Sequence, residues 1–191
     1  MPYIRLDDDD NVRVDDEDNV TYTGSFAYHT VDEVAYKPKK FDPTMLTGTS
    51  AVIHAMLRAI NLTEFHVRFD GGHDEGFAHA DGGRTADGQL RSIESVVDEL
   101  ATPERIGAIK AAPNPDDPRQ RYLSEYYAKL APTELVRRML DELGDMMASC
   151  LLGSGYGTGE YSMYGAFVAD LSTGELTDDP SAQRPPDVNF D

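Results

Sequence analysis

The histidines and aspartates of one short segment are the residues of this chain whose types and spacing can support site chemistry. Three of the five histidines, His66, His73 and His79, fall within it, together with several aspartates. Imidazole nitrogens mixed with carboxylate oxygens suit zinc, manganese or iron. One interpretation is therefore a metal-dependent hydrolase, in which the bound ion activates water. Its ligands would be Asp70, His73, Asp74 and His79.

A structural interpretation of the same residues is favoured over a metal site. The stretch Gly71-Gly72-His73-Asp74-Glu75-Gly76 has the glycine and polar residues that a tight turn requires. Alternation of His66 and Arg68 with apolar residues is typical of the solvated face of a sheet. The sequence contains no fixed-spacing signature such as His-Glu-x-x-His. We therefore expect no catalytic residue and no cofactor, apart from this candidate divalent ion.

Two strands must position this segment. Phe65, Val67 and Phe69 alternate with polar residues, which indicates a strand with one buried face. Residues 77–80 have the composition of the returning strand, and the aspartate and glycines at 81–83 should end it. The sequence thus predicts a hairpin over residues 64–80, in which histidines 66 and 79 can share one face.

Helical periodicity dominates the middle of the chain. The longest helix should open at Pro132 and carry Cys150 on its apolar side, as a buried and unreactive thiol. Further helices are predicted from Ser50 to Asn61, from Leu90 to Leu100, after Thr102-Pro103, and along the apolar side of residues 122–130. Strands are predicted within residues 20–28 and in a closing hairpin that joins residues 161–170 to 175–177.

These elements predict an α+β fold, in which antiparallel β-hairpins form one sheet packed against several amphipathic helices. The regular alternation of strand and helix that a doubly wound parallel sheet requires is missing. With 40% hydrophobic residues, the chain can bury one continuous core. We expect a single domain over residues 20–178, preceded by an acidic arm at 1–19 and followed by an irregular tail at 179–191.

Acid is the strongest feature of the composition, since 35 Asp and Glu stand against 17 Lys and Arg and the formal net charge is -18. Such a charge repels nucleic acid and anionic membranes, so we expect neither direct nucleic acid binding nor membrane binding. No apolar run is long enough to span a membrane and no apolar signal segment is visible, which favours a cytoplasmic protein, or a virion protein if a virus encodes it. The acid is densest in the arm, where eight carboxylates gather: Asp7, Asp8, Asp9, Asp10, Asp15, Asp16, Glu17 and Asp18.

The acidic surface has several interpretations. High aspartate with scarce lysine is a halophilic-like composition, which keeps a protein soluble at high salt. A DNA-mimic inhibitor would place carboxylates where phosphates stand. Aspartates of the arm as calcium or magnesium ligands are disfavoured, because the run lacks the glycine and the final glutamate of an EF-hand loop.

A family resemblance adds a context. Members of a family of small uncharacterised bacterial and phage domains pair an aromatic-Asp-Gly-x-x-Asp-x-Gly hairpin with a glycine- and aromatic-rich C-terminal strand. The first pattern resembles Phe69, Asp70, Gly71, Asp74 and Gly76, and the second is similar to residues 164–170. The likeness covers residues 50–80 and 133–178, with an insertion between them. It implies a compact α+β fold and a viral or mobile-element context, and it carries no activity.

The interpretation that joins these observations is a non-enzymatic binding or assembly protein. The acidic arm would engage basic protein surfaces or other subunits of an assembly through its eight carboxylates. The metal-dependent hydrolase and the DNA mimic remain the alternatives.

Overall fold

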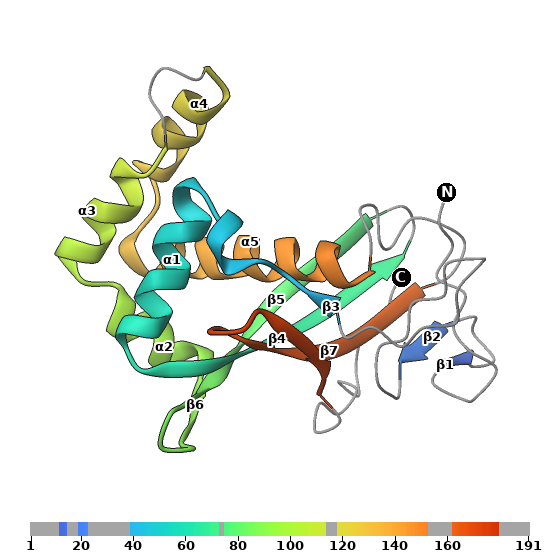
Figure 1. Ribbon diagram of the computed structural model, residues 1–191. Helices are drawn as coiled ribbons and strands as arrows, with labels where there is room; N and C mark the ends of the chain where they lie inside the picture. The colour runs from blue at the N-terminus through green and yellow to red at the C-terminus, as the bar shows by residue number, and fades with distance from the viewer. Residues whose placement is uncertain are drawn as a thin grey trace.

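The computed structural model describes residues 12–14, 19–22, 39–72, 75–113, 118–152 and 162–179. Over these ranges the chain forms one β-sheet with helices packed against one of its faces (Figure 1). The predicted α+β fold, with antiparallel hairpins in one sheet against several amphipathic helices, is confirmed. None of the helices in these ranges has both the length and the apolar character that crossing a membrane requires.

The strands of the sheet follow the order β1-β2-β7-β4-β5-β6, and β8 pairs with both β7 and β3. Neighbouring strands run antiparallel, except for β2 and β7, which are parallel. The strands are β1 (Val12–Val14), β2 (Asn19–Tyr22), β3 (Lys39–Lys40), β4 (Leu62–Gly72), β5 (Glu75–Thr85), β6 (Leu90–Ser92), β7 (Ser162–Asp170) and β8 (Glu175–Asp178).

The central hairpin of β4 and β5 confirms the one predicted over residues 64–80 and is longer than predicted. The prediction that Gly82 and Gly83 end the returning strand is wrong, since both lie inside β5. A Cβ atom at the first glycine would collide with the backbone oxygen of Arg91, and one at the second with the backbone oxygen of Glu64. These glycines therefore serve the close approach of neighbouring strands.

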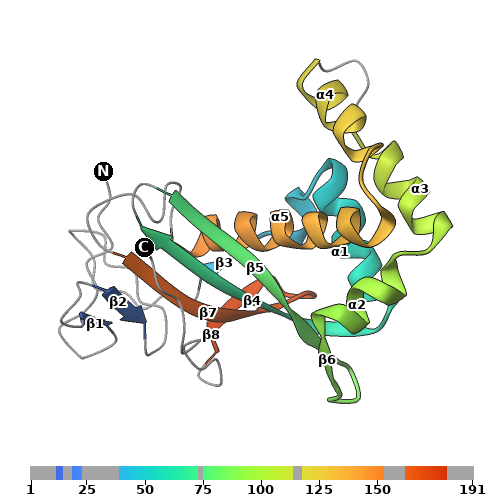
Figure 2. The same ribbon diagram turned by 180° about the vertical axis from the view of Figure 1, so that it is seen from behind.

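The helices gather at one end of the sheet and over one face. The hydroxyl of Thr102 caps the third helix, as predicted, by accepting the N–H of Arg105 at 3.4 Å. The fourth helix stands away from the sheet (Figure 2). The helices are η1 (Pro43–Met45, a 3-10 turn), α1 (Gly48–Ala59), α2 (Ile93–Leu100), α3 (Pro103–Ala111), α4 (Pro118–Tyr127) and α5 (Pro132–Leu152).

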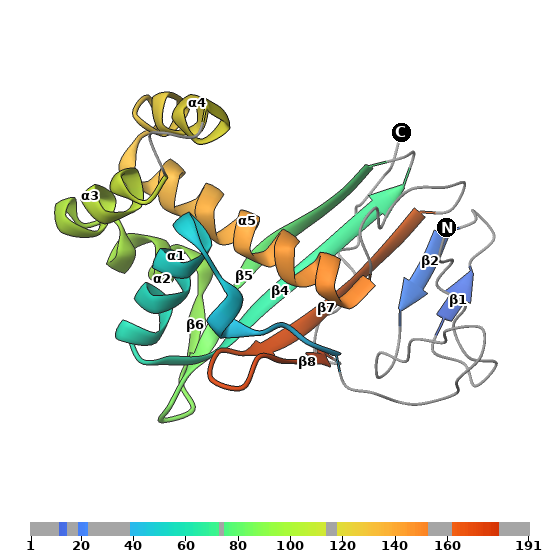
Figure 3. The same cartoon turned by 45° about the horizontal axis from the view of Figure 1, so that its top comes forward.

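Helix α5 lies across β4 and β5 and forms the centre of the core (Figure 3). Gly144 permits this contact, because a Cβ atom there would already lie 3.1 Å from Cγ1 of Val67 on β4. The rings of Phe65, Phe69 and Phe167 are buried in the same core. The alternation seen in the sequence of β4 therefore corresponds to a face covered by α5.

Two residues that were predicted to lie on the buried, apolar sides of helices are exposed. Leu90 is 63% exposed, because residues 90–92 form β6 and the helix begins only at Ile93, capped by the hydroxyl of Ser92. The prediction of a buried Cys150 is also wrong. Cys150 lies about 60° around the helix axis from Met147, at the margin of the buried stripe of α5, and its side chain is exposed.

The predicted acidic arm and the predicted tail fall largely outside the described residues. Of the arm, Val12–Val14 form β1, which pairs with β2, while all eight carboxylates named above lie outside the described ranges. Of the tail, Asp179 is described, and its backbone N–H donates to the carbonyl of Ala166 at 3.1 Å. The chain just after β8 is thus held against β7.

Candidate functional site

The face of the sheet that points away from α5 carries the polar residues of the central hairpin. On β4, Glu64, His66, Arg68 and Asp70 alternate with the core residues. Arg68 lies opposite His79 on β5, so the prediction that the two histidines share one face is confirmed. This polar face is the place where the sequence-predicted site must be assessed.

His79 forms an ion pair with Asp70 across the two strands. Its Nε2 atom lies 3.4 Å from Oδ1 of Asp70, and the two side chains are 59% and 31% exposed. The hydrogen bond to Asp70 raises the pKa of His79, burial partly opposes this, and the charges of Asp70 and Asp141 add to the rise. The pair therefore favours the protonated imidazolium on an accessible part of the surface.

The proposed metal ligands are brought together only in part. Asp70 and His79 are in contact, whereas His73 and Asp74 lie outside the described residues. Within the described ranges, no three His, Cys, Asp or Glu side chains are close enough to hold a metal ion together. The pair supplies one nitrogen and one oxygen donor, and a complete site would need donors from residues 73 and 74.

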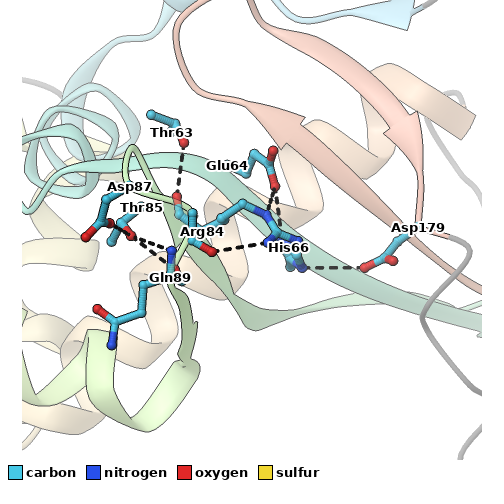
Figure 4. Close-up of polar contacts among 9 residues, drawn as sticks. Thr63, Glu64, His66, Arg84, Thr85, Asp87, Gln89 and Asp179 are labelled. Carbon is cyan, nitrogen blue, oxygen red and sulfur yellow. Dashed lines mark hydrogen bonds and ion pairs between the residues drawn. The ribbon is translucent and has the colours of Figure 1, made fainter.

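A second polar cluster surrounds His66 (Figure 4). Nε2 of His66 lies 3.5 Å from Oε2 of Glu64, and Nδ1 lies 3.5 Å from Oδ2 of Asp179. Arg84 donates from Nε to the same Glu64 oxygen at 2.9 Å. The side chain of His66 is only 15% exposed, which differs from the solvated position that its alternation in the sequence suggested.

This cluster is better suited to holding the sheet together than to catalysis. Both ring nitrogens of His66 face carboxylates, so neither is directed at a substrate. The contact joins the strand β4 to the residue that follows β8. Asp179 was missed by the sequence reasoning because it was placed in the irregular tail, next to a proline, and pairing between distant segments leaves no local signal.

The outer edge of β5 has a short stretch without a neighbouring strand in the described part of the chain. Strand β6 pairs only with residues 82–84, and residues 75–80 pair only with β4. The backbone N–H of Ala80 donates to Oδ1 of Asp141 on α5 at 2.9 Å. Phe77, on the polar face of the same stretch, is 49% exposed.

Five arginine side chains in the described residues form ion pairs with carboxylates of the same chain. The pair of Arg68 and Asp81 measures 2.9 Å, and that of Arg138 and Glu142 measures 2.9 Å. The other such pairs are Arg84 with Glu64, Arg91 with Glu99, and Arg137 with Glu94. Five arginines are thus neutralised within the molecule.

His54 is a structural histidine. It is buried, and its Nε2 donates to the carbonyl of Leu171 at 2.8 Å, which joins α1 to the turn after β7. Burial lowers the pKa of His54, the hydrogen bond to Leu171 opposes this, and the charge of Arg58 lowers it further. The folded protein therefore favours the neutral imidazole here.

Helix α4 exposes the apolar residues that were predicted to form its buried side. Tyr122, Leu123 and Tyr126 are exposed, while Tyr127 is buried and donates from its hydroxyl to Oε2 of Glu142 at 3.1 Å. Burial and the charge of Glu142 raise the pKa of Tyr127 to about 12, so the hydroxyl remains a donor. The buried side of α4 is narrower than the sequence pattern indicated.

No protein-family model matches the chain, and comparisons with curated proteins and with solved structures found no match. The resemblance to bacterial and phage domains therefore stays a prediction.

Proposed function

We propose that this protein is a non-enzymatic binding or assembly component that engages a basic protein surface. The observation that carries the proposal is the internal pairing of the arginines. Five of them are each held by a carboxylate of the same chain. Each such pair is neutral, so the formal excess of 18 negative charges is left to solvent and partners.

An excess of this size favours cationic partners. Long-range attraction increases the rate at which oppositely charged surfaces meet, and it is screened by salt. The same charge disfavours nucleic acid and anionic membranes. The partner would therefore be a polypeptide with clustered lysine or arginine, in the cytoplasm or in a virion, and the resemblance to phage domains supports an assembly context.

The acidic arm is the part of the chain where carboxylates are densest. Its residues Asp7–Asp10 and 15–18 would contact the partner, with Val12–Val14 between them held in the sheet. Deleting the arm would also remove β1, so substitution is the sharper experiment. Replacing Asp7–Asp10 by asparagine removes four charges and leaves β1 in place.

The binding of a labelled lysine-rich synthetic peptide, followed by fluorescence anisotropy at several salt concentrations, tests the proposal. The unmodified protein should bind with an affinity that falls steeply with salt, and the arm variant should bind at least tenfold more weakly. The control carries four neutral substitutions at exposed helical carboxylates: Asp98→Asn, Glu104→Gln, Glu125→Gln and Glu134→Gln. No binding of the peptide at low salt would contradict the proposal, and equal losses in both variants would remove the arm as the contact.

A metal-dependent hydrolase is the second candidate, and the contact of 3.4 Å between Asp70 and His79 favours it. Elemental analysis of the purified protein and thermal melting with and without a chelator test it. A stoichiometric metal that is lost in a double variant, Asp70→Asn with His79→Gln, would support this function. Absence of metal together with an unchanged melting temperature would rule it out.

A further inference from the structure

The edge of β5 at residues 75–80 combines an open strand edge with negative charge. In an antiparallel pair, backbone groups of successive residues point alternately toward and away from the neighbouring strand. The N–H of Ala80 points away from β4, because it donates to Asp141 on α5. Gly76 and Ala78 have the same parity and lie before the irregularity in the register, so their N–H and C=O groups point outward as well.

The described residues leave this edge without a strand neighbour. Strand β6 ends its pairing at Gly82, and no described strand continues it along residues 75–80. Open edges of this kind are sites where an extended peptide can add a strand. The small residues Gly76 and Ala78 allow a peptide backbone to approach closely.

The surroundings of the edge select a partner of particular chemistry. Asp141 stands beside the edge on the side of α5, and Glu75 is exposed at one end of the stretch, whereas Asp81 at the other end is paired with Arg68 at 2.9 Å. On the opposite side, the exposed ring of Phe77 offers an apolar contact. A partner strand would thus meet the carboxylate of Asp141 on the side of α5, and the ring of Phe77 together with the carboxylate of Glu75 on the other side.

We propose that residues 75–79 of β5, through the outward backbone groups of Gly76 and Ala78, bind an extended basic peptide segment by β-strand addition, with basic side chains toward Asp141 and apolar side chains beside Phe77. This inference rests on the proposed function and deepens it by giving the partner a conformation and a site. The main-chain hydrogen bonds would provide affinity, and the alternation of side chains would provide specificity.

A second copy of the chain is disfavoured as the occupant. If two such edges paired antiparallel about Ala78, Glu75 of one copy would lie opposite Asp81 of the other, and the ion pair of Asp81 with Arg68 would offset only part of the repulsion between these carboxylates. The carboxylate of Asp141 would also be present on both sides. A basic segment meets no such repulsion.

The probe for this inference is a labelled synthetic peptide of alternating lysine and valine, compared with the same peptide N-methylated on alternate backbone nitrogens. Methylation keeps the charge and removes the donors that strand addition requires. Fluorescence anisotropy with the full-length protein should show at least tenfold weaker binding of the methylated peptide. Equal binding of both peptides would overturn strand addition and leave the electrostatic proposal intact.

A matched pair of variants locates the site. Phe77→Lys places a charge on the open edge, whereas Leu90→Lys places the same charge on the exposed strand β6, away from the edge. The first variant should lose at least tenfold in affinity and the second should stay within about twofold, with both melting close to the parent. Equal effects of the two variants would overturn the site. If the unmodified protein bound no lysine-rich peptide at low salt, the proposed function would be overturned as well.

Discussion

The carboxylate of Asp141 on α5 accepts a hydrogen bond of 2.9 Å from the backbone N–H of Ala80 on β5. A carboxylate of the helix thus accepts the backbone N–H that a neighbouring strand would otherwise bind. Because Ala80 is buried, its N–H would lose a partner that water cannot readily replace.

Removal of this carboxylate should therefore destabilise the protein. We expect Asp141→Ala to lower the free energy of unfolding by about 1–2 kcal/mol, because it leaves a buried donor without its charged acceptor. Asp141→Asn keeps an acceptor and should lose less than half of that. Urea unfolding measures both, with Asp98→Ala, at an exposed position of α2, as the control; equal losses in all three variants would contradict the role of the hydrogen bond.

The pair of Asp70 and His79 should be visible as a pKa difference. Asp70 raises the pKa of His79, so the folded state binds the proton more tightly than the unfolded state. The stabilisation is fully present below the unfolded pKa of about 6.5 and is lost as the pH rises through the folded value. In an NMR titration, Asp70→Asn should bring the pKa of His79 down, while Glu75→Gln should change it little.

His54 should give the opposite pH dependence. Its folded pKa is lowered by burial, so its contribution is complete above about pH 6.5 and is lost as the pH falls through the folded value. His54→Gln, which keeps an N–H donor for Leu171, should show a smaller drop in melting temperature between pH 7.5 and pH 5.5 than the parent. An unchanged drop would assign the acid sensitivity to other groups.

Two glycine substitutions should change the free energy of unfolding in opposite directions. Gly83→Ala forces a Cβ atom against the backbone oxygen of Glu64 and should destabilise by about 2–4 kcal/mol. Gly107→Ala in α3 meets no atom within 4 Å and should stabilise by about 0.5–1 kcal/mol, because alanine is the better helix former. Urea unfolding of both variants checks the two predictions. A Gly83→Ala protein as stable as the parent would contradict the close approach of β4 and β5 at this residue.

Local patterns in the sequence predicted much of this fold. Phe65, Val67 and Phe69 revealed the buried face of β4, and the long apolar stripe after Pro132 revealed α5. The closing hairpin of β7 and β8 was equally clear from its turn residues. Each of these signals lies within one element, where side-chain alternation or helical spacing is set by backbone geometry.

The relationships that the sequence did not reveal join distant segments. The glycines inside β5 were interpreted as turn residues, because nothing in the local sequence shows that the backbone of a neighbouring strand leaves no room for a Cβ atom there. Asp179 was assigned to the tail although it contacts His66. The candidate site shows the same limit. The contact between Asp70 and His79 could be expected from a hairpin, whereas the hydrogen bond from Ala80 to Asp141 depends on where α5 crosses the sheet.

The parallel pairing of β2 with β7 determines how late in synthesis this part of the sheet can form. Asn19 pairs with Ser162, so β2 can pair with β7 only after the long stretch of chain between these two residues has been synthesised. Until then, that strand edge is available to other chains, and closing so long a loop is slow. The dense negative charge beside it would keep copies of the nascent chain apart during that interval.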